Sequence, residues 1–340
     1  MTRAEQQSEQ PPASRPAALR ALAQAFDDGL LTQLGPFLER RFEHYRLIGM
    51  GGSYSVAAQC AAWMRSLNLD AAAERASSWY GFPMDENTLT IAVSSSGATT
   101  EVLDRLDRLD GHFPVLAITN VASSPLTSRA GAVLPIHAAA TTGTTAGANQ
   151  HAALVLHALA ILFSGGLPDM VARDLAVLTG KVADATEDLL DRRADWSPAA
   201  AAALGIDEGP DGEIVCLAPA ERISSAELAA LALRRGAGLA AGAIETADYW
   251  HTGPVPRAGQ DPRTSPGSAL LFTGSGYEKD TVNRLIALGT RIVAIGAGSD
   301  TAELTAAGAV AVRFRNDAHD KTALHTEAFV AELLADSAGD

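Results

Sequence analysis

The sequence predicts an α/β protein with two doubly wound parallel sheets of the flavodoxin-like kind, in tandem along one chain. Three observations lead to this fold class. Short apolar runs typical of buried strands alternate with amphipathic helical patterns. Strand candidates of the first half recur in the second half in the same order, offset by roughly 165 to 180 residues. Two of the first-half runs pass directly into glycine- and serine-rich turns that open a helix.

The predicted elements of the first half follow from local composition. Residues 1–18 are polar and contain several prolines, so we expect an arm without regular structure. Apolar residues at helical spacing predict a docking helix over residues 19–37. Five strands then place the first α/β domain at residues 38–168. The strand candidates are Arg46–Met50, Ala71–Ala76, Leu89–Val93, Val115–Thr119 and Val133–His137.

The second half repeats this pattern after a helical connector. Helical periodicity and an alanine-rich stretch predict the connector over residues 169–203. The second α/β domain is expected at residues 204–328, followed by a C-terminal tail at residues 329–340. Its strand candidates are Glu213–Ala218, Ala243–Ala247, Ala269–Thr273, Arg291–Gly296 and Val310–Phe314.

Composition and charge exclude several classes of protein. The chain has 340 residues, of which 47% are hydrophobic, enough for two domains of ordinary size. A net charge of −14 argues against nucleic acid as a partner, because binding its backbone requires a basic face. No apolar run reaches the length of a membrane span, and the N-terminus does not resemble a signal peptide. We therefore expect a cytoplasmic protein without a membrane partner.

The cysteines and histidines give no sign of a metal or redox site. Cys60 falls in a helical pattern and Cys216 in a strand pattern, so both are expected to be buried free thiols. No cysteine–histidine spacing suggests zinc. We expect neither a metal nor a cofactor.

The turn after Leu89–Val93 is the strongest chemical signal. Ser94, Ser95, Ser96 and Gly97 separate a buried strand from an amphipathic helix. Such a turn presents hydroxyls and backbone amides at a helix N-terminus, which suits a phosphate or another anion. The alternative is an ordinary connector, in which the serines satisfy only their own turn.

A second turn of the same kind follows the first strand. Gly49, Gly51 and Gly52 permit a close backbone approach, and Ser53 adds a hydroxyl. The string resembles a dinucleotide fingerprint but has Tyr54 instead of a glycine at the expected later place. Because the carboxyl ends of parallel strands share one edge of a sheet, both turns are expected at that edge.

The second half lacks convincing equivalents of these turns. Pro219 stands where the first half has its glycines, and the third-strand turn carries one serine, Ser275, next to the acidic Glu278. The sequence therefore predicts one anion site per chain, in the first half.

These motifs together resemble the sugar isomerase (SIS) family. They are Gly51–Tyr54, the Ser94–Thr99 turn, Leu116–Asn120 and Thr141–Gln150, within a likeness that covers about residues 40 to 325. The likeness is closest to the two-SIS isomerase half of glucosamine-6-phosphate synthase and to free-standing phosphosugar isomerases, aminosugar-phosphate deaminases and fructosamine-phosphate deglycases. It implies a phosphorylated sugar or aminosugar as ligand and a homodimer. By position, substrate contacts would fall on Gly52, Ser53, Ser94, Ser95, Ser96, Gly97, Thr99, Thr142, Gly143 and Thr144.

The segment Ile244–Pro254 resembles the family's acidic-x-x-His-Gly-Pro loop, with Asp248 at the acidic place and His251 at the histidine. In relatives this histidine is supplied across a dimer to the neighbouring subunit's sugar and helps to open the ring. An imidazole can take or give a proton near neutral pH, which suits ring opening. Thr252 makes the loop one residue longer here, and a histidine held by a backbone carbonyl is the alternative interpretation.

The general base is where the chain departs from the family. Isomerisation through an enediol needs a base that moves a proton between C1 and C2, and in relatives a glutamate does this. Here Arg235, or Arg234 with a one-residue slip, takes that position, and a guanidinium stays protonated. Glu227 on the same helix and Glu245 near the histidine loop are the remaining acid/base candidates.

Two functional interpretations follow from these residues. In the first, the protein is an aldose–ketose phosphosugar isomerase or a related deaminase or deglycase, with His251 and Glu227 or Glu245 as acid and base. In the second, the base is lost, and Arg235 grips a phosphate or carboxylate in a sugar-phosphate sensor. A purely structural protein fits the hydroxyl-rich loops poorly.

Overall fold

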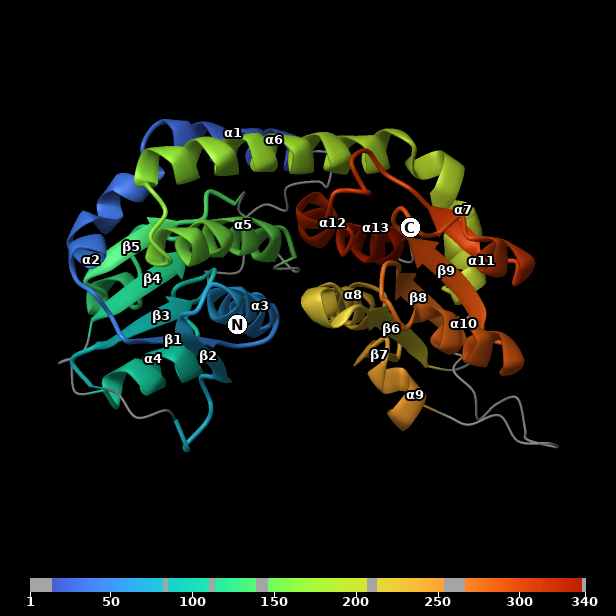
Figure 1. Ribbon diagram of the computed structural model, residues 1–340, viewed down its shortest axis with the longest axis horizontal. Coiled ribbons are helices and arrows are strands. Elements are labelled where there is room, and N and C mark those ends of the chain that lie inside the picture. Colours follow the sequence, from blue (N-terminus) through green and yellow to red (C-terminus); the bar gives the residue numbers. More distant parts are fainter. Residues whose placement is uncertain are drawn as a thin grey trace, which may run out of the picture. The chain divides into compact units, whose positions relative to one another are not determined.

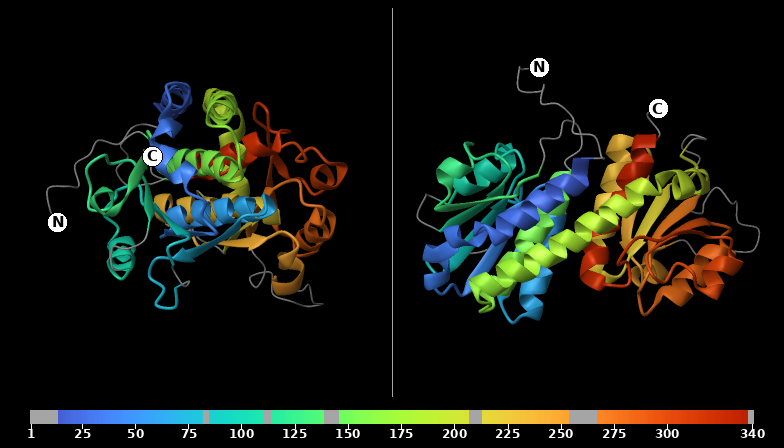
Figure 2. Two further views of the ribbon diagram at one scale, coloured as in Figure 1. Left: turned by 60° about the vertical axis from the view of Figure 1, so that its left-hand side comes forward. Right: turned by 90° about the horizontal axis from the view of Figure 1, so that it is seen from above.

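The computed structural model describes residues 14–81, 85–109, 114–138, 146–206, 213–253 and 267–337. The chain forms two compact units, divided between Ala183 and Asp184 (Figure 1). Each unit contains one five-stranded parallel sheet. One long helix, α6 (Pro168–Asp191), begins in unit 1 and ends in unit 2 (Figure 2). The predicted fold class is confirmed.

Unit 1 has the strand order β2-β1-β3-β4-β5. The chain therefore winds in one direction from β1 to β2 and in the other from β3 to β5, which puts helices on both faces of the sheet. Its strands are β1 (His44–Gly49), β2 (Asp70–Arg75), β3 (Thr88–Val93), β4 (Val115–Thr119) and β5 (Ala132–Pro135). The helices that follow them are α3 (Gly52–Ser66), α4 (Thr100–Asp107), the 3-10 turn η3 (Thr127–Arg129) and α5 (Ala146–Phe163).

The segment expected as one docking helix is divided into three short helices. These are α1 (Arg15–Asp27), η2 (Leu30–Leu34) and α2 (Gly35–Glu39). Gly29 separates the first two because its φ of 92° lies in the left-handed region, which ends an α-helix. The apolar residues that motivated the prediction, Leu19, Leu22 and Phe26 among them, are fully buried.

Unit 2 has the strand order β7-β6-β8-β9-β10, the same topology as unit 1. Its strands are β6 (Ile214–Ala218), β7 (Ala241–Glu245), β8 (Ser268–Phe272), β9 (Arg291–Ile295) and β10 (Val310–Val312). Its helices are α7 (Arg193–Leu204), η4 (Ala220–Arg222), α8 (Ile223–Gly236), α9 (Asp248–Thr252), α10 (Glu278–Ala287), α11 (Ala302–Ala306), α12 (Asp320–Thr326) and α13 (Phe329–Ser337).

The β7 strand ends two residues earlier than the sequence predicts. The Glu245 carboxylate accepts a hydrogen bond of 2.8 Å from the Asp248 amide. This side chain satisfies a donor at the start of α9, so the chain leaves the sheet directly after Glu245.

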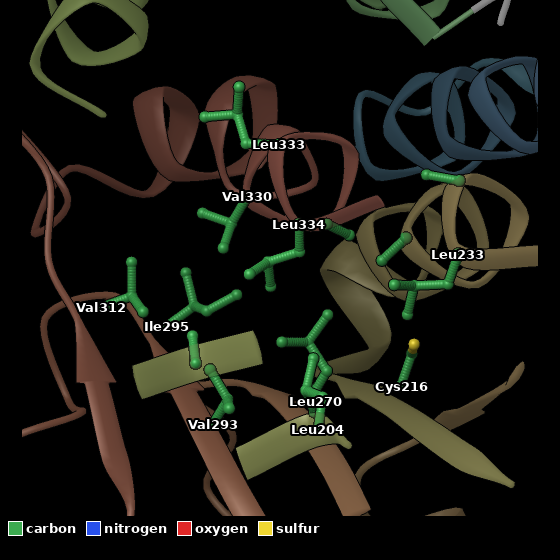
Figure 3. Close-up of a cluster of buried hydrophobic side chains, with 14 of the residues drawn as sticks. Leu204, Cys216, Leu233, Leu270, Val293, Ile295, Val312, Val330, Leu333 and Leu334 are labelled. Atoms are coloured by element: carbon green, nitrogen blue, oxygen red, sulfur yellow. The ribbon is translucent and has the colours of Figure 1, made fainter. Parts of the chain in front are cut away.

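Alternating strand residues build the two hydrophobic layers of unit 2. Cys216 and Leu270 pack with Leu233 of α8 and Leu334 of α13 in one cluster (Figure 3). The neighbouring strand residues, such as Leu217, pack with the side chains of α10 in a second cluster. Because successive side chains of a strand point to opposite faces, a sheet covered on both faces needs near-continuous apolar strands.

Both cysteines are buried free thiols, as predicted. Cys60 donates to the carbonyl oxygen of Leu156 over 3.3 Å, and burial raises the pKa of both Cys60 and Cys216. Across the described ranges, no helix combines the length and apolarity that a bilayer span requires.

A buried histidine ties α5 to the end of β5 in unit 1. The Nδ1 atom of His151 lies 2.9 Å from the carbonyl oxygen of Ile136, and the residue is 1% exposed. Burial lowers the pKa of His151 to about 4 from its ordinary value of 6.5. His151 is therefore neutral in the folded protein, and Nδ1–H donates to that carbonyl.

This histidine makes the stability of unit 1 depend on pH. Above pH 6.5 both folded and unfolded states hold a neutral His151, so its contribution is fully present. Between pH 6.5 and about 4 only the unfolded state takes up the proton, and up to about 3 kcal/mol of stability is lost. Urea titrations should show this loss in the wild-type protein and a flatter profile in His151→Asn, which keeps an amide donor. Parallel profiles between pH 7 and 4.5 would contradict the buried, neutral state.

Candidate functional site

The turn between β3 and α4 depends on one glycine. The Ser94 amide donates to Ile118 over 3.0 Å, and the Gly97 amide donates back to the Ser94 carbonyl over 3.1 Å. Gly97 has a φ of 63°, and a Cβ atom there would lie 2.2 Å from Oγ of Ser124. Gly97 is therefore required both by its backbone conformation and by the lack of space.

The hydroxyls of this turn have different tasks. The buried Ser94 hydroxyl lies 2.9 Å from Oγ1 of Thr99, the N-cap residue of α4. The Thr99 side chain forms no capping hydrogen bond with the first turn of α4. Oγ of the exposed Ser96 accepts from the Ala98 amide over 3.2 Å and keeps its proton for another acceptor. The half-buried Ser95 hydroxyl bonds to no described residue.

The turn between β1 and α3 places a glycine against a side chain from α5. Gly51 has a φ of 53°, and α3 begins at the buried Gly52. A Cβ atom at Gly52 would lie 2.2 Å from Nδ2 of Asn149, a side chain that is 3% exposed. The Ser53 side chain is half-buried, and its hydroxyl bonds to no described residue.

The strand order brings these two turns to the same edge of the sheet. β1 and β3 are parallel neighbours, with Ile48 opposite Ala92. The chain leaves β1 for one face and β3 for the other, so the two turns diverge at this switch point, the place where open α/β sheets bind ligands. The structure thus brings together the predicted contacts Gly52, Ser53, Ser94, Ser95, Ser96, Gly97 and Thr99. The predicted contacts Thr142, Gly143 and Thr144 lie outside the described residues.

Two residues at this edge were missed from the sequence. Asn149 was included only within the motif Thr141–Gln150 and was given no role. A polar residue in the first turn of the otherwise apolar α5 could have indicated that its side chain faces the site. Arg75 ends β2 in register with Gly49, and its guanidinium carbon lies 4.1 Å from the ring centroid of Tyr54. Arg75 is exposed and forms no ion pair within the described residues. It supplies a positive charge beside the β1–α3 turn in an acidic chain.

In unit 2, charged side chains of the chain itself occupy the corresponding places. In unit 1 the Ala76 amide, directly after β2, donates to the Gly49 carbonyl oxygen. In unit 2 the Thr246 amide, directly after β7, donates to the Ala218 carbonyl oxygen, so Gly49 and Ala218 are equivalent positions. Arg222 consequently stands in unit 2 where Ser53 stands in unit 1. Its Nη1 atom donates to Oε2 of the fully buried Glu327 over 2.7 Å.

A second internal carboxylate binds the turn after β8. Oε2 of Glu278 accepts from the Gly274 amide over 2.6 Å, and burial raises the pKa of this carboxyl. Arg222 also donates to the carbonyl oxygen of Thr273 in the same turn. The Gly274 amide is therefore engaged by a carboxylate of the chain itself, which supports the prediction that the ligand site belongs to the first half.

The predicted acid/base residues all lie in unit 2. His251 is exposed in the last turn of α9, and Glu245 is held at the start of the same helix by its bond to the Asp248 amide. Glu227 is half-buried near the start of α8. Within the unit, Glu245 and His251 thus share one short segment at the carboxyl end of β7.

Arg235 lies at the opposite end of α8. This helix starts after the carboxyl end of β6 and finishes before the first residue of β7. Arg234 donates to the carbonyl oxygen of that first residue, Ala241, which puts the last turn at the amino edge of the sheet. Glu227 is roughly 12 Å nearer to the carboxyl edge along the helix axis. The structure does not bring Arg235 to the carboxyl edge of its own sheet, and its role stays a prediction.

The stretch from β1 to α5 contains both serine- and glycine-rich turns. Residues 43–161 match the model of the SIS domain. No curated protein matches the chain. The SIS-matching segment includes every predicted substrate contact in unit 1, from Gly52 to Thr144.

Solved structures share the fold across nearly the whole chain. The C-terminal domain of glucosamine-fructose-6-phosphate aminotransferase from Francisella tularensis superposes with a TM-score of 0.74, at 16% identity over 95% of this chain and 93% of that one. Tagatose-6-phosphate ketose/aldose isomerase from Escherichia coli gives 0.71, at 19% identity over 95% and 89%. Glucosamine-6-phosphate deaminase from Thermotoga maritima gives 0.60, at 19% identity over 94% and 93%. At identities below 20%, these superpositions show similarity of fold alone.

The contact between Gly52 and Asn149 can be tested by substitution. Gly52→Ala should lower the free energy of unfolding by about 1–3 kcal/mol, because the new methyl group overlaps a buried amide. Adding Asn149→Ala removes that amide and should recover part of the loss in denaturant titrations. Gly180→Ala is the control, since no atom lies within 4 Å of a Cβ there. Equal effects of the single and double variants would show that the two residues do not meet.

Proposed function

We propose that the chain binds a phosphorylated sugar or aminosugar at the carboxyl edge of the unit 1 sheet. One observation carries this proposal. The Ser53 and Ser95 hydroxyls lie in the two turns at the switch point between β1 and β3, and neither forms a hydrogen bond with a described residue. The first turn of α4, uncapped by Thr99, adds backbone amides and the positive end of a helix dipole.

This donor set suits a phosphate monoester in an acidic protein. The phosphate is a dianion with three strong acceptor oxygens, and hydroxyls and amides donate to it without adding net charge. Arg75 is a nearby cation. The sugar part is supported by the solved structures of similar fold, since the tagatose-6-phosphate isomerase and the glucosamine-6-phosphate deaminase are named for phosphosugar substrates.

The proposed reaction is aldose–ketose isomerisation, or the related deamination or deglycation of an aminosugar phosphate. His251 would transfer a proton to or from the ring oxygen as the ring opens, and Glu227 or Glu245 would move the proton between C1 and C2. In this proposal the enzyme is a cytoplasmic homodimer that uses no metal or other cofactor. The His251 loop of one subunit then serves the neighbouring subunit's sugar.

A sugar-phosphate sensor is the alternative. It is favoured by the arginines at the end of α8, where the family resemblance implies the catalytic base. It is also favoured by the bond between Glu245 and the Asp248 amide, which gives this carboxylate a structural task. A sensor would use the same serine-rich edge but catalyse no proton transfer.

Removing hydroxyls from the switch point should weaken phosphosugar binding. Ser53→Ala and Ser95→Ala should each reduce the affinity for fructose 6-phosphate by roughly 10- to 100-fold in calorimetric titrations, because each removes a hydrogen bond to a charged group. Ser128→Ala is the matched control, since the hydroxyl of Ser128, in η3, donates to the carbonyl oxygen of Pro125. Unchanged affinity in both variants would place the ligand elsewhere.

Solvent deuterium distinguishes the enzyme from the sensor. Incubation with fructose 6-phosphate, glucosamine 6-phosphate or a fructosamine phosphate in deuterated water should place deuterium at C1 or C2 if a proton is transferred. His251→Ala should reduce this exchange by roughly 10²- to 10⁴-fold while binding remains. Thr252→Ala, on the same helix, is the control. Tight binding without exchange from any of the three sugars would favour the sensor.

A further inference from the structure

Each unit buries one arginine at the same place in the helix that follows its third strand. Arg105 of α4 is 7% exposed and Arg284 of α10 is 6% exposed. Ser94 in unit 1 and Thr273 in unit 2 are equivalent, because the amide of each donates to the fourth strand of its own sheet. Arg105 lies eleven residues after Ser94, and Arg284 lies eleven residues after Thr273, so the two arginines are equivalent as well. Both arginines reach the segment that follows the second strand of their sheet.

In unit 2 this segment carries His251. Nη2 of Arg284 donates to the carbonyl oxygen of Gly253 over 2.6 Å, and Nη1 donates to the carbonyl oxygen of Trp250. The guanidinium carbon lies 5.3 Å from the ring centroid of Trp250 and 5.8 Å from that of Tyr249. His251 lies in sequence between the two carbonyl groups that the arginine holds. The guanidinium therefore fixes the backbone on both sides of the histidine.

The helix that presents His251 cannot hold its own shape. α9 has five residues, and a helix of that length does not recover the entropy lost in its nucleation. The last carbonyl groups of any helix lack intrahelical partners, and a cation there also complements the helix dipole. Arg284 meets both needs. A second bond, from the Thr281 hydroxyl to the Thr246 carbonyl oxygen over 2.7 Å, ties α10 to the same segment.

Unit 1 shows the same device without a histidine. Nε and Nη2 of Arg105 lie 2.9 and 2.8 Å from Oε1 of Glu74, near the end of β2. A Cβ atom at Gly81 would overlap the Arg105 guanidinium, so the segment after β2 also packs directly against the arginine. Arg105→Lys is therefore a matched control, because Arg105 is a buried arginine in the equivalent place and packs against residues 76–81, which include no histidine, aspartate or glutamate.

We propose that Arg284 is the positioning residue for His251, which it aims by fixing the Trp250 and Gly253 carbonyl groups. This inference rests on the proposed function, in which His251 transfers a proton to or from the substrate. The two bonds are charge-assisted and come from a planar fork that a lysine cannot reproduce. Because a guanidinium stays protonated, the two bonds of the clamp do not weaken through loss of a proton from Arg284.

The test compares Arg284→Lys with Arg105→Lys in the full-length protein. Arg284→Lys should lower kcat for deuterium incorporation by roughly 10- to 100-fold, since a displaced acid/base group loses its geometry. Its KM should change by less than about twofold, because the phosphate contacts are residues of unit 1. Arg105→Lys should leave kcat within about twofold of the wild-type value. A similar loss of kcat in both variants would overturn the proposal, because it would indicate general destabilisation.

Backbone hydrogen exchange provides a readout independent of turnover. Arg284→Lys should speed amide exchange by at least about tenfold in the peptide covering residues 246–253, and Arg105→Lys should do so in residues 76–81 instead. Unchanged exchange in residues 246–253 would overturn the clamp. If the wild-type protein exchanges no deuterium into any of the three sugar phosphates, the proposed function fails, while this measurement still decides whether Arg284 holds the segment.

A milder variant covers the case in which Arg284→Lys does not fold. Thr281→Val keeps the shape of a side chain that is 1% exposed and removes only its bond to Thr246. It should lower kcat by roughly three- to tenfold without changing KM, with a smaller increase of exchange in residues 246–253. A loosened segment with unchanged kcat, in either variant, would show that the position of His251 does not depend on this clamp.

Discussion

The parallel pairing of β1 with β3 is the constraint on which the candidate site depends. These strands are neighbours in space although β2 comes between them in the chain. The helices after them must cover opposite faces of the sheet, so the two connecting turns diverge from one point. This divergence leaves the Ser53 and Ser95 hydroxyls without protein partners in the described part of the chain. Their neighbours Ser94 and Gly97 are fixed by internal hydrogen bonds.

The two units show opposite electrostatic solutions to the same topology. In unit 1 the switch point is lined by glycine, serine and an asparagine, with Arg75 at its margin. In unit 2 the equivalent place holds the Arg222–Glu327 ion pair, and the Glu278 carboxylate occupies the neighbouring turn. Removing two charges from water has a large cost that only a close partner offsets. In unit 2 the Arg222 and Glu327 charges offset each other at this place, whereas in unit 1 the same place has neutral hydroxyl and amide donors.

Short elements in unit 2 depend on tertiary partners for their position. α9 is stabilised at its start by the Glu245 carboxylate and at its end by Arg284. Neither residue is part of the helix, and Arg284 comes from α10. A loop fixed in this way can present His251 with a defined backbone although α9 alone would not form. The same dependence explains why a loop residue can be more sharply placed than its local sequence suggests.

The sequence by itself determined the fold class and the first-unit turns. Apolar runs are long enough to mark strands buried on both faces, and Ser94 to Gly97 can only be a turn because of their composition. Local patterns also predicted that Gly52 and Ser53 open the helix after the first strand, as they do in α3. What they could not specify were partners distant in sequence, because burial and pairing are set by packing rather than by neighbours along the chain.

Only the tertiary structure decided which side chains meet at the turns of the second unit. Arg222 and Glu327 are 105 residues apart, so nothing local indicates that they meet. Asn149 reaches Gly52 because α5 crosses α3, and Arg284 reaches the His251 segment because α10 packs beside α9. A residue's type fixes the chemistry it can perform, whereas its partner is chosen by the one arrangement that buries both.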